Sequence, residues 1–206
     1  NGVFAAIMAR RGITGPLEAF EGPRGFKKQL GASFDLPAFG GGAVPYAIEA
    51  DKLKHYPCDY EAQCSITPAL ELHKALKGKV NEIEKIDVET YDNAIYVAAD
   101  TRDKWNPTSR ETADHSIPYV VAVALLFGTV TLRSFNDAHL WHPGLRGILP
   151  KIRVIEDQEF SRVYKKHPVE HRARVTVVMK DGQTLIAEAG GDEDDLSHEM
   201  SDAKVM

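Results

Sequence analysis

One polar segment, residues 101 to 119, gathers side chains that could act on an anionic substrate. It contains Arg102, Lys104, Arg110, His115 and Tyr119, and a run of apolar residues follows directly. Guanidinium and ammonium groups bind carboxylates, and imidazole has an ordinary pKa near neutral pH. The segment therefore predicts either a carboxylate-binding site or a solvated loop in which His115 caps or packs against the next helix.

Other clusters of reactive residue types have spacings that fit known sites poorly. The Gly40–Gly42 run lacks the Lys-Ser or Lys-Thr of a phosphate-binding loop and is interpreted as a hinge or turn. Cys58 and Cys64 have no second cysteine pair, so they are interpreted as two ordinary thiols. His139 and His142 are interpreted as surface or packing residues, with a metal pair as the alternative. We therefore predict no metal site.

Composition favours a cytoplasmic protein that binds small molecules. The hydrophobic fraction of 43% is sufficient for a core, and the net charge of -5 gives no reason to expect nucleic acid or a membrane surface as a partner. The apolar run at residues 119–128 is much shorter than the roughly 20 residues that span a bilayer. Residues 1–11 lack the pattern of a signal peptide.

Periodicity predicts helices and strands without a regular βαβ repeat. Asp181-Gly182 between two apolar runs is the strongest hairpin signal, since both turn positions tolerate positive φ. We expect an α+β fold in which an antiparallel sheet packs with helices. The expected helices are 1–11, 25–30, 66–76, 117–127 and one that follows Thr131; the expected strands are 47–56, 86–90, 151–155, 174–180 and 183–189; residues 100–113 are expected to form a loop.

Both ends of the chain are expected to be cuts through a longer protein. The amphipathic helix at residues 1–11 cannot bury its apolar face alone. At the other end, Ser201 has the features of a helix cap, with only one turn of chain after it.

Several separated blocks resemble the MmgE/PrpD family. Residues 104–107 and 110–126, which read Lys-Trp-Asn-Pro and Arg-Glu-Thr-Ala-Asp-His-Ser-Ile-Pro-Tyr followed by an apolar run, are similar to its central signature. Tyr56-Pro57 with the helix after it resembles a second family segment. Residues 1–26 and 200–205 are similar to the points where the chain leaves and re-enters a helical domain.

The resemblance implies a two-domain protein with its active site between a large helical domain and a smaller α+β domain. Residues 1–33 would end the helical domain, residues 34–196 would form the α+β domain, and residues 197–206 would begin the return. The helical domain would be a partner of this chain, and homodimers are expected. Most of the family's acid–base residues lie in the helical domain, outside this sequence.

The resemblance also implies a lyase similar to 2-methylcitrate dehydratase, acting in propionate catabolism without a cofactor. His115 and Tyr119 match the family's His-Ser-X-X-Tyr block, and we expect them to be catalytic. Arg102, Lys104 and Gln63 are expected to bind a small carboxylate substrate. The alternatives are a non-catalytic substrate-binding lid, an epimerase or isomerase, or a cis-aconitate decarboxylase. Gln63 stands where the decarboxylases carry histidine, which argues against the last of these.

Overall fold

The computed structural model describes residues 1–31, 42, 44–46, 48, 53–167 and 169–190. The chain divides into two compact units, Asn1–Asp51 and Lys52–Met206. The domain boundary predicted between residues 33 and 34, and the predicted return at residues 197–206 with its cap Ser201, lie outside the described residues.

The first unit contains two short helices, α1 (Gly2–Arg10) and α2 (Phe26–Leu30), which confirm the helices predicted there. Neither helix has a buried residue, and Val3, Phe4 and Ile7 of α1 are exposed. A short helix gains most of its stability by packing its apolar face. In the described part of the chain, α1 leaves that face in solvent.

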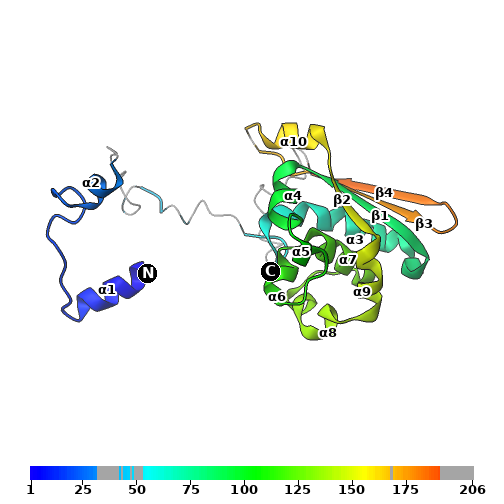
Figure 1. The fold of residues 1–206 in the computed structure, drawn as a ribbon, viewed down its shortest axis with the longest axis horizontal. Coiled ribbons are helices and arrows are strands. Elements are labelled where there is room, and N and C mark those ends of the chain that lie inside the picture. The colour runs from blue at the N-terminus through cyan, green and yellow to red at the C-terminus, as the bar shows by residue number, and fades with distance from the viewer. Residues whose placement is uncertain (32–41, 43, 47, 49–52, 168, 191–206) are drawn as a thin grey trace. The chain divides into compact units, whose positions relative to one another are not determined.

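The second unit is built on a four-stranded sheet in the order β2-β1-β3-β4 (Figure 1). Strand β3 (Ala173–Met179) pairs antiparallel with both β1 (Ile83–Thr90) and β4 (Thr184–Ala189), as predicted. Strand β2 (Ile152–Glu156) instead pairs with β1 in parallel, so the sheet is mixed. A parallel pair needs a long crossover connection, and the helices between β1 and β2 supply it.

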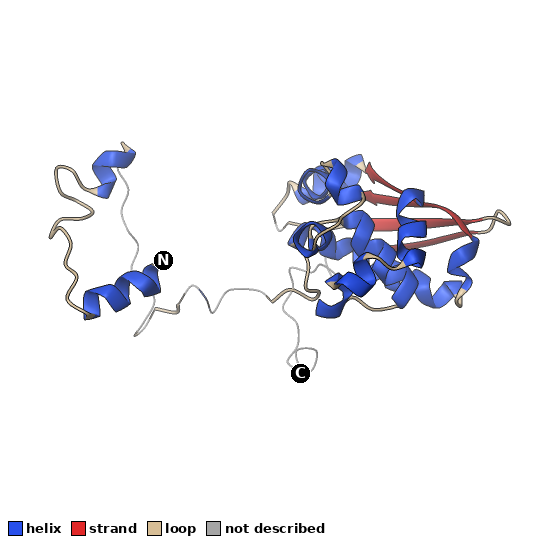
Figure 2. Ribbon diagram, turned by 60° about the horizontal axis from the view of Figure 1, so that its bottom comes forward, coloured by secondary structure: helices blue, strands red, loops and turns tan. Residues whose placement is uncertain are grey.

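Helices α3 (Ile66–Leu76) and α7 (Ile117–Phe127) form the layer against one face of the sheet (Figure 2). Both match their predicted bounds. The strand residues that alternate toward this layer are fully or almost fully buried: Ile83, Ile86, Val88, Thr90, Ala173, Val175, Val177 and Met179. Helix α7 is buried from Ile117 to Leu125. Apolar contact between this layer and the sheet therefore forms the core.

The remaining elements surround this core. Residues 53–56, the described end of the strand predicted at 47–56, form no strand, and most of the rest of that segment lies outside the described residues. Thr131 precedes a 3₁₀ helix rather than an α-helix. The short elements are η2 (Tyr60–Ser65), η3 (Lys79–Glu82), α4 (Asp92–Ala98), α5 (Arg102–Trp105), α6 (Arg110–Asp114), η4 (Leu132–Phe135), α8 (Asp137–Leu140), α9 (Pro143–Ile148), η5 (Leu149–Lys151) and α10 (Gln158–Tyr164).

The β3–β4 hairpin forms where Asp181-Gly182 predicts it, but its turn differs from the one expected. Only Gly182 has positive φ, at +87°, whereas Asp181 is not in the left-handed region. The N–H of Gly182 donates to the carbonyl of Met179, and the N–H of Met179 donates to the carbonyl of Gln183. These bonds describe a three-residue loop with a glycine bulge.

None of the described helices is both long enough and apolar enough to cross a membrane.

Replacing Gly128 with alanine tests how α7 ends against α3. Gly128 has φ of +67°, and a Cβ there would lie 2.4 Å from Nε2 of His73. Nδ1 of His73 is 2.8 Å from the carbonyl oxygen of Leu125, so moving the ring also breaks a link between α3 and α7. We expect Gly128→Ala to lower the free energy of unfolding by about 3 kcal/mol, measured by urea denaturation.

Gly182→Ala is the matched control, because a Cβ there would meet no atom within 4 Å. It should lose only the conformational part, about 1–2 kcal/mol. Equal losses in the two variants would contradict the role given to His73.

Candidate functional site

Residues 101–119 are more ordered than the predicted loop, because they contain α5, α6 and the first turn of α7. The loop predicted for residues 100–113 was wrong because short helices form there without apolar periodicity. A serine cap stabilises α6, whereas α5 begins after Thr101 with no side-chain cap. Oγ of Ser109 accepts a hydrogen bond from Thr112 N at 3.2 Å, and Oγ of Ser116 accepts one from Tyr119 N at 3.1 Å. Ser116 also donates to the backbone carbonyl of Lys104.

His115 lies at the end of α6 with its imidazole between two carboxylates. Nδ1 is 2.5 Å from Oδ1 of Asp114, and Nε2 is 3.8 Å from Oδ2 of Asp59. The side chain is 53% exposed. A hydrogen bond from Nδ1–H to Asp114 selects the tautomer whose Nε2 can accept a proton. The group can therefore exchange a proton with a molecule in solvent.

The segment that leads to Gln63 meets the segment of His115 through a backbone hydrogen bond. Asp59 N donates to the carbonyl of Asp114 at 2.7 Å, and Gln63 lies on η2, the short helix that follows Asp59. Gln63 is fully buried, and its Oε1 accepts hydrogen bonds from the backbone N–H groups of His55 and Tyr56.

The amide nitrogen of Gln63 has no hydrogen-bond partner among the described residues. A buried donor without an acceptor is costly, so this nitrogen needs a water or a ligand oxygen.

The two cations predicted to bind substrate differ in their surroundings. Arg102 is exposed and has no hydrogen bond or ion pair to the described part of the chain. Lys104 is occupied, since its Nζ lies 2.5 Å from Oδ1 of Asp100 and 2.6 Å from the carbonyl of Val97. The structure therefore leaves Arg102 available to an anion and gives Lys104 a part in holding α5 against α4.

Tyr119 is inside the core rather than in the solvent-facing group. It is fully buried, and its hydroxyl donates to the carbonyl of Ser134 at 2.7 Å. Burial raises the pKa of this phenol to about 12. The hydroxyl is committed to Ser134, and this geometry gives the predicted catalytic role of Tyr119 no support.

Three residues that sequence reasoning did not select contribute to the same region. Asp59 and Asp114 flank the imidazole of His115. Asp114 directly precedes His115 in the sequence and Asp59 comes two residues after the Tyr56-Pro57 motif, which was the available signal. Lys54 is also exposed, and its Nζ donates to the carbonyl of Cys58 rather than to a carboxylate of the described residues.

Arg146 on α9 holds the loop between α5 and α6, and no sequence pattern indicates this role. Its Nη1 donates to Oδ1 of Asn106 at 2.5 Å, and its Nη2 donates to the carbonyl of Pro107 at 2.7 Å. Its Nε donates to the carbonyl of Leu140, and the guanidinium lies 4.6 Å from the ring centroid of Trp141. The loop that leads to His115 is therefore tied to α8 and α9.

Within the described ranges, no group of three or more His, Cys, Asp or Glu side chains could hold a metal ion. Cys58 and Cys64 are both buried free thiols. Burial raises the pKa of each to about 12, so both stay protonated near neutral pH. The two cysteines thus have the properties of packing residues.

Comparison with known proteins agrees with this α+β unit. Residues 56–206 match the model of the MmgE/PrpD C-terminal domain, which places His115 and Gln63 inside the matched region. The chain belongs to the MmgE/PrpD family.

Similar curated proteins carry one activity in their names. The chain is 30% identical over 145 residues to 2-methylcitrate dehydratase of Cupriavidus necator. The aligned region covers 68% of this chain and 29% of that protein. It is 29% identical over 133 residues to 2-methylcitrate dehydratase of Escherichia coli K12, and the alignment covers 62% of this chain and 26% of that protein. A mitochondrial 2-methylcitrate dehydratase of Yarrowia lipolytica is 29% identical over 137 residues, and the alignment covers 63% of this chain and 25% of that protein. The chain thus spans less than a third of the length of these relatives.

Tyr119→Phe tests the placement of the phenol in the core. Below pH 10 the free energy of unfolding of the variant should be about 1 kcal/mol lower than that of the wild type, because the Ser134 carbonyl loses its donor. The folded pKa of about 12 lies above the ordinary value of 10.0, so the wild type loses stability as the pH rises from 10 toward 12. The difference between the two proteins should therefore shrink over that range.

Urea denaturation of both proteins at pH 8 and pH 11 measures this difference. A difference that stays constant between the two pH values would mean that Tyr119 is solvated and keeps its ordinary pKa in the folded protein.

Proposed function

We propose that this chain is part of a lyase that removes water from a hydroxy tricarboxylate, with 2-methylcitrate as the first substrate to test. The observation that carries the proposal is the family match together with similarity to three proteins named 2-methylcitrate dehydratase. The α+β unit would form one wall of a site completed by residues outside this sequence.

The reaction requires a base, an acid and bound cations. The base removes a proton from the carbon next to a carboxylate, the C–O bond breaks, and the acid protonates the hydroxyl that leaves as water. General acid–base groups each contribute about 10²–10⁴-fold. Negative charge that develops on the substrate carboxylate must be stabilised by cations or donors fixed in advance.

His115 is the residue proposed for proton transfer. Its Nδ1 is held by Asp114, and its Nε2 faces solvent beside Asp59. The nearby carboxylates would repel an anionic substrate, so this assignment needs cations close by.

Arg102 and Lys54 are the cations proposed to bind substrate carboxylates, because neither is paired with a carboxylate of the described residues. The Nε2 of Gln63 is proposed as an additional donor, since it is buried without an acceptor. Lys104 is proposed to order the loop rather than bind substrate directly, given its contact with Asp100.

His115→Ala in the full-length protein that contains this chain tests the assignment. We expect kcat for 2-methylcitrate to fall by about 10²–10⁴-fold with a smaller change in KM. Formation of the alkene conjugated with a carboxylate is followed by ultraviolet absorbance. His139→Ala is the matched control, because His139 is a partly exposed histidine on α8 that contacts Asn136 and the ring of Phe127 and no carboxylate of the described residues. Unchanged kinetics in the His115 variant would remove that residue from the mechanism.

The alternative is a lid that binds substrate without catalysing its reaction. It is favoured by the coverage of less than a third of each relative. The assay with 2-methylcitrate separates the two when the 206-residue chain and the full-length protein are run in parallel. Turnover of 2-methylcitrate by the 206-residue chain alone would contradict the lid hypothesis. If the full-length protein is inactive on both 2-methylcitrate and citrate, the dehydratase assignment is wrong.

A further inference from the structure

A half-buried carboxylate, that of Glu61, lies at the centre of a polar cluster outside the group around His115. Its Oε2 accepts a hydrogen bond from the hydroxyl of Tyr91 at 2.5 Å, and its Oε1 accepts one from the hydroxyl of Tyr164 at 3.4 Å. Glu61 lies on η2, whereas Tyr91 directly precedes α4 and Tyr164 ends α10. One side chain therefore links three elements that are up to 103 positions apart in the sequence.

The two phenols are fixed by their own contacts and act as donors. Their rings are stacked with centroids 4.3 Å apart, and Tyr91 is fully buried. Asn93 donates to the hydroxyl oxygen of Tyr164 at 3.0 Å, which leaves the Tyr164 proton for Glu61. Burial raises the pKa of both phenols, and the charge of Glu61 raises it further. Both hydroxyls therefore stay protonated near neutral pH, and a buried donor needs its acceptor.

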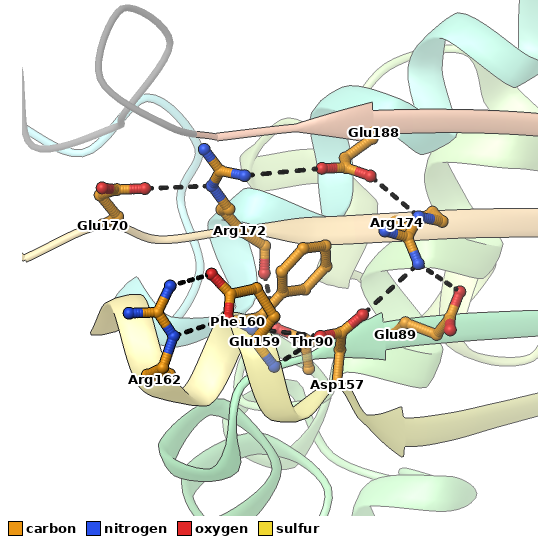
Figure 3. Close-up of polar contacts among 10 residues, drawn as sticks. All are labelled: Glu89, Thr90, Asp157, Glu159, Phe160, Arg162, Glu170, Arg172, Arg174 and Glu188. Atoms are coloured by element: carbon orange, nitrogen blue, oxygen red, sulfur yellow. Dashed lines mark hydrogen bonds and ion pairs between the residues drawn. The ribbon is translucent and has the colours of Figure 1, made fainter. Parts of the chain in front are cut away.

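The segments that carry the phenols are fastened to the sheet (Figure 3). Thr90, at the end of β1, donates from Oγ1 to the carbonyl of Arg172 at 3.0 Å, just before the chain reaches Tyr91. Asp157 caps α10, and its Oδ2 lies 3.4 Å from Nη1 of Arg174 on β3. The hydroxyls thus have firm supports from which to hold a carboxylate.

The backbone of Glu61 carries this restraint toward His115. The N–H of Glu61 donates to Oδ1 of Asp59 at 3.0 Å, and Oδ2 of the same carboxylate lies 3.8 Å from Nε2 of His115. The N–H of Asp59 donates to the carbonyl of Asp114, the residue before His115. The two oxygens of Asp59 are therefore divided between the residue that the phenols hold and the atom proposed to transfer a proton.

We infer that Glu61 is a positioning residue, which holds the Asp59 carboxylate in its contact with His115. The hydroxyls of Tyr91 and Tyr164 fix its side chain, and its N–H fixes Asp59. Both of its carboxylate oxygens are occupied within the chain, so its part in the reaction is indirect. The inference rests on the proposed function, because it assigns Glu61 a role through the proposed acid–base group. Displacement of a reacting group by about 1 Å can lower a rate by about 100-fold.

Glu61→Gln in the full-length protein that contains this chain tests the inference. Glutamine keeps the size of the side chain but replaces one acceptor oxygen with an NH₂ donor, so one phenol loses its acceptor. We expect kcat for 2-methylcitrate to fall by about 10- to 100-fold while KM changes by less than about threefold. Tyr91→Phe keeps the ring and removes one of the two bonds, so it should lower kcat in the same direction.

Glu156→Gln is the matched control. Oε1 of Glu156 also accepts a hydroxyl, that of Ser161 at 2.7 Å, but Glu156 ends β2 and has no contact with η2 among those described. Its kcat should equal that of the wild type. A wild-type kcat in both Glu61→Gln and Tyr91→Phe would overturn the inference.

A double variant separates positioning from a general loss of stability. If Glu61 acts through Asp59, then Asp59→Ala combined with Glu61→Gln should be no slower than Asp59→Ala alone, since residues in one line of contacts are not additive. A further loss of about tenfold in the double variant would show that Glu61 acts by another route and would contradict the inference.

Hydrogen–deuterium exchange of the same proteins gives a readout that needs no turnover. Glu61→Gln should speed the exchange of the Asp59 and Glu61 amides by about tenfold, measured in peptides that cover residues 58–65, and Glu156→Gln should not. Unchanged exchange rules out the restraint on Asp59, whatever the activity. If the wild type is inactive on 2-methylcitrate and citrate, the dehydratase proposal fails, and exchange alone decides whether Glu61 holds Asp59.

Discussion

The second unit depends on the complete burial of α7. Every residue from Ile117 to Leu125 is buried, and the helix is apolar around its whole circumference. Such a helix is stable only when it is surrounded, so α3, the sheet and the short helices must all lie against it. Gly128 ends α7 in the left-handed conformation, and Ser116 begins it with a side-chain cap. The buried segment is therefore fixed at both ends.

The position of His115 follows from this burial. His115 stands two residues before α7, between the Ser116 cap and the last turn of α6. The backbone bond from Asp59 to Asp114 then fastens the segment that carries Gln63 to the same place, and Arg146 anchors the loop on the far side of α6. A solvent-facing group is thus supported by a rigid helix and by contacts from two distant parts of the chain. This is the arrangement that a precisely positioned polar site requires.

Much of the fold was predictable because it follows local periodicity. Helices α3 and α7 and the β3–β4 hairpin follow from apolar spacing and from turn residues. The parallel β1–β2 pair could not be predicted, since the direction of pairing is set by the path of the chain between the strands. The short helix α6 was missed because it depends on a serine cap, which leaves no apolar pattern.

The candidate site was predicted less completely than the fold. His115 and Gln63 were predicted to act together, and they belong to segments that meet. The ion pair of Lys104 with Asp100 and the burial of Tyr119 were not predicted, because both depend on the folded structure. A lysine or tyrosine in a motif carries no local sign of whether its polar group is free. The contacts of Arg146 join residues 40 positions apart in the sequence, so no local sequence pattern could predict them.

The order of strands in the sheet has a consequence for biosynthesis. Strand β1 is an inner strand, yet both of its neighbours, β2 and β3, come more than sixty residues later in the chain. A ribosome adds about 5–20 residues each second, so the apolar side chains of β1 wait several seconds for their first sheet partner. Nascent chains that stall between β1 and β2 would expose an unpaired apolar strand, the form of chain that chaperones bind.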